Sequence, residues 1–247
     1  RAHNAQEAIS CLTEATYYFK NISVDLIYGI PGLSNKQWKK NIDIVLSSGI
    51  THISSYALTV EPKTALESLI KKGMIEDVSD FQAQEQFYIL IEELSKHNFT
   101  HYELSNFAKG GAFSINNSSY WKGKSYLGIG PSAHSFNGKQ RGWNVKNNSK
   151  YISTIQQNKL PIERELLSIT DQYNEYVMTG LRTIWGVSLE KVTQEFGKEY
   201  YTYLLFQSEK YRAEELLYIE DEKLKTTKKG KFLSDGISAD LFKLNVS

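Results

Sequence analysis

The chain has 247 residues and a formal net charge of +1, and 40% of its residues are hydrophobic. With these values, neither a disordered chain nor a strongly basic nucleic-acid-binding domain is the first expectation. The length allows one large domain or two ordinary ones. Cys11 is the only cysteine, so the chain has no disulfide framework, and one thiolate cannot hold a zinc or iron–sulfur site by itself.

The chain carries no recognisable membrane or export signal. No apolar run approaches the roughly 18 to 20 residues that span a bilayer, and residues 1–7 contain no apolar signal-peptide region. We therefore predict a cytoplasmic protein. Because the chain begins with Arg1 directly before a helical pattern, we interpret it as part of a longer protein.

Helical and strand patterns alternate over residues 1–104. Capping boxes begin two of the helices, at Asn4 with Glu7 and at Ser34 with Gln37. A strand, a helix and a second strand then follow one another as in a βαβ unit, which predicts parallel strands. The predicted order is a helix after Asn4, a strand over 22–28, a helix from Ser34 to Gly49, a strand over 52–59, helices over 63–72 and 80–96, and a strand over 101–104.

Parallel strands joined by helices predict the α/β fold class, here part of a TIM-like βα barrel that is open or closed. Residues 106–148 differ in texture, because glycines interrupt aromatic and polar residues without a sustained period. We predict loops or short irregular strands there, and a segment of this length without a helix is more often functional than a plain linker. We assign residues 1–148 to the barrel domain.

The remaining residues, 149–247, form a second predicted domain that is mostly helical. Three helical patterns are followed by two strand-like runs around the acidic turn at Glu220-Asp221-Glu222, and then by a last helical pattern over 231–242. Three helices, a hairpin and a helix predict a small winged-helix-like domain.

Asp25 is the first candidate for a binding role, because it is a carboxylate within an otherwise apolar predicted strand. A buried carboxylate needs a partner or a polar cavity to offset its desolvation. Pairing with a donor on a neighbouring strand is the structural explanation, and a ligand hydroxyl is the functional one. The residues alone leave both explanations open.

His134 and the pair Tyr120-Trp121 lie in the glycine-rich segment. An imidazole among glycines has room to reach a ligand, so His134 is a candidate for a functional role. Adjacent aromatic side chains in a loop either stack on a planar ligand or anchor the loop on the core.

The run Lys228-Lys229-Gly230-Lys231 beside the predicted hairpin raises a nucleic-acid-binding function. Acidic residues lie close to it in the sequence, at 214–215 and 220–222. A solvated surface of mixed charge therefore explains the run better than a nucleic-acid interface.

Five segments in the same order closely resemble the HemN/HemW family, which comprises oxygen-independent coproporphyrinogen III oxidases and related radical-SAM heme chaperones. The segments are Asp25–Gly32 (DLIYGIPG), Ser54–Pro62 (SSYALTVEP), Tyr102–Ala108 (YELSNFA), Ser119–Trp121 (SYW) and Tyr126–Ser135 (YLGIGPSAHS). Residues from Asn174 to Gly230 resemble the family's C-terminal domain. The YELSNFA and YW patterns resemble the HemW branch more than the HemN oxidases.

The resemblance implies a radical-SAM barrel that binds S-adenosylmethionine (SAM) on a [4Fe-4S] cluster held by three cysteines in a CxxxCxxC loop. This chain has no such loop, so the cluster is expected in the full-length protein only and this chain alone is expected to be inactive. The resemblance assigns SAM contacts to Arg1 through the SAM carboxylate, to Asp25 through the ribose hydroxyls, to Thr59 and to His134.

The resemblance also implies a heme site, because HemW-type proteins share an HNxxYW motif tied to heme binding. Here the matching residues include Asn117, Tyr120 and Trp121, but the motif histidine is replaced by Asn116. A neutral amide is a poor iron ligand beside an imidazole. We therefore expect His134 or a part of the protein outside this chain to supply an axial ligand.

The hypothesis from the sequence is a radical-SAM heme chaperone of the HemW type that binds SAM and heme and delivers heme to an acceptor protein. One alternative is an oxygen-independent coproporphyrinogen III oxidase, which decarboxylates the propionates of its tetrapyrrole substrate. The other is a nucleic-acid-binding winged-helix module, which the near-neutral charge disfavours.

Overall fold

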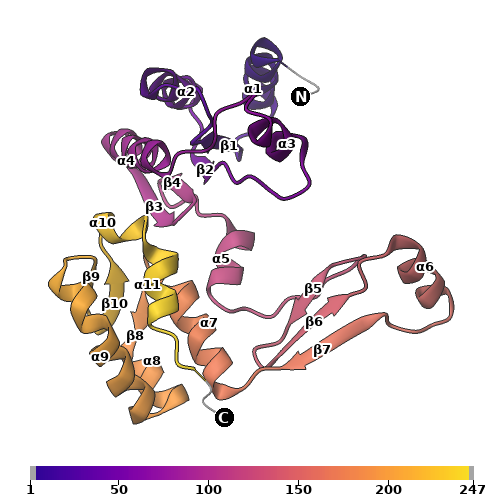
Figure 1. The fold of residues 1–247 in the computed structure, drawn as a ribbon, viewed down its shortest axis with the longest axis vertical. Helices are drawn as coiled ribbons and strands as arrows, with labels where there is room; N and C mark the ends of the chain where they lie inside the picture. Colours follow the sequence, from indigo (N-terminus) through magenta and orange to yellow (C-terminus); the bar gives the residue numbers. More distant parts are fainter. Residues whose placement is uncertain (1–3, 245–247) are drawn as a thin grey trace. The chain divides into compact units, whose positions relative to one another are not determined.

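The structure, a computed structural model, describes residues 4–244 and divides into two compact units, residues 1–114 and 115–247 (Figure 1). The elements of the first unit are α1 (Ala5–Tyr18), β1 (Ser23–Tyr28), α2 (Asn35–Ser47), β2 (His52–Ala57), α3 (Ala65–Lys71), α4 (Asp80–Lys96), β3 (Phe99–Glu103) and β4 (Asn106–Lys109).

The helices of the first unit begin where the capping signals predict. Asn4 and Glu7 exchange the two hydrogen bonds of a capping box at α1, and Ser34 and Gln37 do so at α2. The apolar stripe of α2 is buried, and its Trp38 donates from Nε1 to the carbonyl oxygen of Gln86 on α4, at 2.9 Å. The two helices therefore pack together.

The strands of the first unit form one sheet in the order β1-β2-β4-β3, and β1 and β2 are parallel as predicted. One face of this sheet packs against α2 and α4. The ring of Tyr28 on β1 lies 5.9 Å from that of Trp38, and the ring of His101 on β3 lies 5.8 Å from that of Phe87 on α4. This apolar face is the core of the first unit.

The part of this sheet that β3 and β4 form differs from the prediction. The predicted strand over 101–104 is β3, but the chain then turns back at once, and β4 lies antiparallel between β2 and β3. The Glu103 carboxylate accepts hydrogen bonds from the Ser105 backbone N–H and from the side chain of Asn106. These bonds stabilise a tight turn that has no glycine or proline, so the turn carries no strong signal in the sequence.

The second unit contains two three-stranded sheets, with the orders β5-β6-β7 and β8-β10-β9. Its elements are α5 (Ile115–Trp121), β5 (His134–Phe136), β6 (Gln140–Asn144), α6 (Asn148–Gln156), β7 (Ile162–Leu166), α7 (Ile169–Leu181), β8 (Val187–Ser188), α8 (Leu189–Lys191), the π-helical turn η1 (Val192–Phe196), α9 (Lys198–Ala213), β9 (Leu217–Glu220), β10 (Lys223–Thr226), α10 (Lys228–Lys231) and α11 (Ser234–Asp240).

The glycine-rich segment is more regular than predicted. It contains β4, the short helix α5 and the strands β5 and β6, and β6 pairs with β7 from beyond the segment. The prediction of a helix-free segment is therefore wrong at α5. Asparagine and serine residues of α5 favour turns and helix caps, so the sequence pattern there does not predict a helix.

The carboxyl-terminal part confirms the predicted winged-helix-like domain. Its helices α7 and α9 and the β9–β10 hairpin enclose an apolar core that includes Val177, Leu204 and Leu224. The acidic turn of the hairpin lies at Asp221 and Glu222, which both have positive φ. The short strand β8 adds a third strand that the sequence did not predict.

The α/β class is confirmed for the first unit, whose sheet is open in the described residues, since β1 and β3 are its edges. The division into two units falls between residues 114 and 115. The predicted domain boundary between residues 148 and 149 lies inside the second unit and stays a prediction about the family's domains.

Candidate functional site

The face of the four-stranded sheet opposite α2 and α4 carries polar side chains. Alternate residues of a strand share a face, and the register pairs Asp25 with Ser54. Ser54 pairs in turn with Asn106 on β4. The three residues therefore lie in one row across β1, β2 and β4.

His52 is buried on the same polar face and joins two strands. Its Nδ1 lies 2.7 Å from the hydroxyl of Ser23 on β1, and its Nε2 lies 2.8 Å from the hydroxyl of Tyr102 on β3. Burial lowers the pKa of His52, and the negative charge of Asp25 opposes this shift in part. Burial also raises the pKa of Tyr102, so both side chains are uncharged at neutral pH.

Ser54, Asn106 and Glu103 form a hydrogen-bonded chain on this face. The Ser54 hydroxyl donates to Oδ1 of Asn106 at 3.0 Å, and the Asn106 amide donates to the Glu103 carboxylate. All three residues are buried, with exposures of 6%, 2% and 2%. This network was missed from the sequence, although Glu103 and Asn106 belong to the YELSNFA segment.

Asp25 is exposed on this face, whereas the neighbouring Ser54 and His52 are buried. Among residues 4–244 its carboxylate forms no hydrogen bond or ion pair, so its acceptor oxygens are available to a ligand. Thr59 is also exposed, two residues beyond the end of β2. Arg1, the third residue assigned to SAM in this unit, lies outside the described residues.

A cavity of about 610 Å³, which we name the α7 cavity, brings together three of the predicted site residues in the second unit. Tyr120 and Trp121 of α5 and His134 of β5 all line it. Residues on one side of α7, among them Glu175 and Met178, also line it. Its volume is within the range of about 300 to 1,000 Å³ that is usual for small-molecule sites.

Aromatic rings form much of the wall of the α7 cavity. The rings of Tyr120 and Tyr126 meet edge to face at 4.7 Å, and Tyr126 lies 6.0 Å from the ring of Phe136 on β5. The guanidinium of Arg182 lies 4.8 Å from the ring centre of Trp121. These contacts fix the ring planes, so the wall is preorganised for a flat apolar ligand.

The charges of the α7 cavity are mixed. Arg141 of β6 forms an ion pair with Glu175 of α7. Lys191 lies 3.6 Å from Glu195 and 4.5 Å from the centre of the Tyr176 ring. Each of these two cations already has an acidic partner, so an anionic ligand would have to share them.

His134 and Met178 are among the side chains of the α7 cavity that are able to ligate heme iron. His134 offers imidazole nitrogens and Met178 offers a thioether sulfur, both of which are axial ligands in heme proteins. His134 is exposed, and its ring lies 6.4 Å from that of Trp143. Met178 was missed from the sequence, because a methionine in the stripe of a helix is indistinguishable there from a core residue.

Asn116 and Asn117 lie on α5, one turn before Tyr120 and Trp121. Asn116 is exposed and Asn117 is half-buried, but neither lines the α7 cavity. The structure therefore assembles Tyr120, Trp121 and His134, and it leaves Asn117 outside their cavity.

The described residues contain no group of three or more His, Cys, Asp or Glu side chains that could hold a metal ion. Cys11, the only cysteine of the chain, is exposed on α1. The residues present therefore do not fit a three-cysteine iron–sulfur cluster. Within residues 4–244, no helix is both long and apolar enough to cross a membrane.

The chain is similar to known proteins over most of its length. The HemN C-terminal domain family matches residues 167–233. The protein named "Heme chaperone HemW" of Bacillus subtilis (strain 168) is 34% identical over 201 residues, which cover 80% of this chain and 53% of that protein. The "Heme chaperone HemW" of Mycobacterium tuberculosis (strain CDC 1551 / Oshkosh) is 30% identical over 239 residues, which cover 96% of this chain and 59% of that protein.

The chain belongs to the HemN/HemW family. This chain shares its fold with the solved structure "Coproporphyrinogen III oxidase (HemN) from Escherichia coli is a Radical SAM enzyme". The TM-score is 0.78 and the sequence identity is 19%, and the match covers 98% of this chain and 59% of that one. The chain thus spans little more than half the length of the relatives it matches. The predicted cytoplasmic location stays a prediction.

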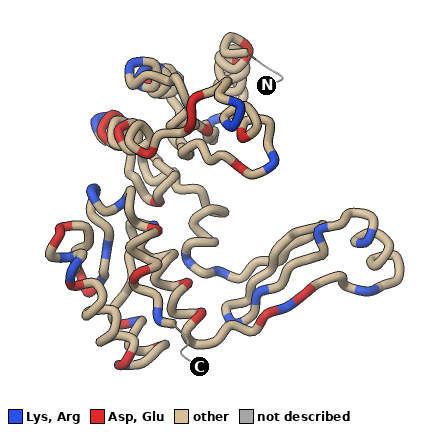
Figure 2. Tube along the Cα trace, viewed as in Figure 1, with Lys and Arg blue, Asp and Glu red and all other residues tan. Residues whose placement is uncertain are grey.

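The C-terminal domain of this family member has an intermixed surface charge. Figure 2 shows Lys and Arg interleaved with Asp and Glu along its described elements. In the hairpin, Nζ of Lys225 lies 2.8 Å from the carboxylate of Glu220, and beside it the Lys229 ammonium donates to the Glu214 carbonyl oxygen at 3.2 Å. The prediction that the chain does not bind nucleic acid stays a prediction.

Proposed function

We propose that the α7 cavity binds heme and that the full-length protein, as a HemW-type chaperone, delivers this heme to an acceptor protein. The observation that carries the proposal is the convergence of Tyr120, Trp121 and His134 on one cavity. His134 lies on a different element from the adjacent pair Tyr120-Trp121, and the family resemblance implies a ligand-binding role for all three. Relatives of this chain are named heme chaperones.

The chemistry of the cavity suits a tetrapyrrole. The rings of Tyr120, Tyr126 and Phe136 offer apolar faces to a flat macrocycle. His134 is the first candidate for the axial ligand, since the motif histidine is replaced by Asn116, whose amide is a poor iron ligand. Arg141 is placed to share its charge between Glu175 and a heme propionate.

We further propose that the polar face of the four-stranded sheet contributes to a SAM site in the full-length protein. The exposed Asp25 carboxylate is suited to accept hydrogen bonds from the two ribose hydroxyls of SAM, and Thr59 lies beyond the end of the neighbouring strand. The [4Fe-4S] cluster on which SAM would bind belongs to other segments, because this chain has one cysteine. His134 as a SAM contact remains part of the same proposal.

A heme titration tests the proposal. Heme is added to the 247-residue chain and to the full-length protein, and the Soret band is followed. We expect a shifted band with saturable binding, which His134→Ala weakens by more than about tenfold and His97→Ala, on the exposed end of α4, leaves unchanged. Absence of any shifted band with the full-length protein would sink the heme-chaperone proposal.

The fold shared with the HemN structure favours one alternative activity, the oxidation of coproporphyrinogen III. This alternative is tested by anaerobic assay of the full-length protein with a reconstituted cluster, SAM and coproporphyrinogen III. Formation of protoporphyrinogen would place the protein with the oxidases. Heme binding without turnover would place it with the chaperones.

A further inference from the structure

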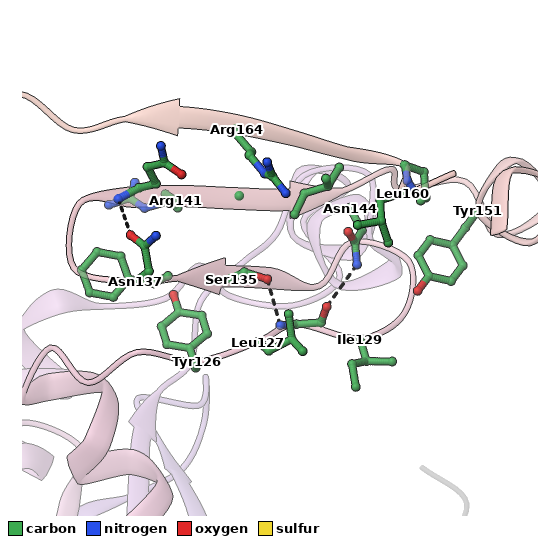
Figure 3. A pocket seen from close by; sticks show the side chains of 16 residues that line it. Tyr126, Leu127, Ile129, Ser135, Asn137, Arg141, Asn144, Tyr151, Leu160 and Arg164 are labelled. Carbon is green, nitrogen blue, oxygen red and sulfur yellow. Dashed lines mark hydrogen bonds between the residues drawn. The ribbon is translucent and has the colours of Figure 1, made fainter. Parts of the chain in front are cut away.

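A second cavity lies in the second unit, and most of its lining residues have no part in the function proposed above. It measures about 580 Å³, and we name it the α6 cavity, because Tyr151 of α6 and the residues that follow α6 line one side (Figure 3). Residues 126–129 line another side, and the sheet β5-β6-β7 with Asn137 of its β5–β6 turn contributes the rest.

The α6 and α7 cavities use opposite faces of this sheet. The register aligns Ser135, Gly142 and Arg164 across β5, β6 and β7, and all three line the α6 cavity. Their neighbour His134 points to the other face, because side chains alternate along a strand, and it lines only the α7 cavity. Tyr126, Phe136 and Arg141 line both cavities, so the two cavities adjoin at these residues and differ in the rest of their lining.

Two glycines keep the floor of the α6 cavity flat. A Cβ on Gly142 would lie 2.9 Å from Cδ1 of Ile162, and one on Gly128 would lie 2.2 Å from the carbonyl oxygen of His134. The segment around Gly128 can therefore lie directly on β5. The Gly128 backbone N–H donates to the Ser135 hydroxyl at 3.0 Å, and the Asn144 amide donates to the carbonyl oxygen of Gly130 at 2.9 Å.

The walls of the α6 cavity are exposed aliphatic side chains. Leu127 is 78% exposed, Ile129 is 83% exposed and Leu160 is 73% exposed, and all three line the same cavity. Figure 3 shows Leu127 and Ile129 on the segment beside β5 and Leu160 on the segment after α6. Apolar side chains gathered around a hollow indicate a binding site more than scattered exposed leucines do.

The charge of the α6 cavity is of one sign. Among the described residues that line it there is no Asp or Glu, whereas two are arginines. Arg141 is already paired with Glu175. The guanidinium of Arg164 forms no hydrogen bond or ion pair within residues 4–244, so its planar donor fork is available for a carboxylate.

We propose that the α6 cavity binds an apolar carboxylate, with the carboxylate on Arg164 and the apolar body between Leu127, Ile129 and Leu160. Two sources share this chemistry, the propionates of a porphyrin and the head group of a fatty acid. The flat floor at Gly128 and Gly142 accommodates either a macrocycle or an extended chain. The four proposed contacts do not line the α7 cavity, so this site depends on side chains that the heme site does not use.

The test uses metal-free protoporphyrin IX and laurate as probes in calorimetric titrations of the 247-residue chain. Arg164→Glu should weaken binding of the cognate acid by more than about tenfold, because it removes a charge-assisted hydrogen bond and adds repulsion. Leu127→Ser should weaken the same acid through the lost apolar contact. Lys198→Glu, an equal charge change at an exposed residue of α9, should leave binding unchanged.

The esters of both probes decide the role of the carboxylate. Binding of one acid that needs Arg164, and that is lost in its methyl ester, supports the proposal and identifies the source. The proposal is overturned if neither acid binds, if Arg164→Glu binds both acids as the wild type does, or if the esters bind as well as the acids. Arg164→Glu should leave the heme Soret titration of the α7 cavity unaltered. The proposal for the α6 cavity and the heme proposal are therefore tested independently.

Discussion

The two sheets that carry the candidate sites differ in what lies against each of their faces. The four-stranded sheet of the first unit has one face closed by α2 and α4 and one polar face whose buried side chains bond to one another. The three-stranded sheet β5-β6-β7 has a cavity on each face. The first sheet therefore has an apolar core of its own, and the second has little side-chain packing to stabilise it.

The difference shows where each sheet obtains its stability. On the four-stranded sheet, burial of rings such as Tyr28 and Phe107 supplies the hydrophobic contribution. The three-stranded sheet depends on its ladder of backbone hydrogen bonds and on the close contact of the segment around Gly128 with β5. A change at that contact should therefore disturb both cavities, whereas a change at a residue that lines only one cavity should disturb only that cavity.

Gly128→Ala should have the largest effect. The added Cβ would lie 2.2 Å from the His134 carbonyl oxygen, so the segment must move away from β5, at a cost of about 1 to 3 kcal/mol in the free energy of unfolding. Because His134 faces the α7 cavity and Gly128 lines the α6 cavity, we expect heme and the apolar acid both to lose affinity. Chemical denaturation and the two titrations measure this.

Gly236→Ala is the matched control for that change. Gly236 lies in α11, and its added Cβ would meet nothing within 4 Å, so the variant should be as stable as the wild type or slightly more stable. If Gly128→Ala kept wild-type affinity for both ligands, the close contact with β5 would not be what shapes the cavities.

Met178→Leu should have an intermediate effect, confined to the α7 cavity. If Met178 ligates the iron that His134 binds, its loss should lower the reduction potential of bound heme, because a thioether ligand raises it. We expect heme affinity to fall roughly tenfold. Spectroelectrochemical titration measures the potential, and binding to the α6 cavity should not change.

Met74→Leu is the matched control, since Met74 is 70% exposed and the chain has only two methionines. A shifted Soret band with equal potentials in Met178→Leu and the wild type would remove Met178 from the iron while leaving heme binding intact. Loss of the band in the wild type itself would instead contradict the proposed function.

Local signals in the sequence predicted much of the fold of the first unit. The capping boxes at Asn4 and Ser34 mark helix starts through side chains within four residues, and the parallel pairing of β1 with β2 follows from the helix between them. The β3–β4 hairpin was not predictable in the same way. Its turn is stabilised by the side chains of Glu103 and Asn106, not by a glycine that a reader of the sequence would recognise.

The candidate site was predictable only in part. Tyr120, Trp121 and His134 were singled out through family motifs, and the fold then brought them to one cavity. Met178 and Arg164 carry no motif, and their roles depend on which face of a helix or strand turns toward a hollow. That orientation depends on strand register and helix packing, which distant contacts set.

The smallest expected effect concerns the polar face of the four-stranded sheet. Burial lowers the pKa of His52, so the folded protein binds a proton there less readily than the unfolded chain, whose histidine pKa is about 6.5. As the pH falls below about 6.5, the unfolded state gains a proton that the folded state does not, and the free energy of unfolding decreases. One proton gives a slope of at most about 1.4 kcal/mol per pH unit.

His52→Gln should remove this part of the pH dependence while keeping polar contacts available to Ser23 and Tyr102. The measurement is urea denaturation of the wild type and the variant between about pH 7.5 and pH 5. The variant should have the lower stability at pH 7.5 and the shallower loss of stability toward pH 5. Equal slopes would mean that His52 is not held neutral in the folded protein.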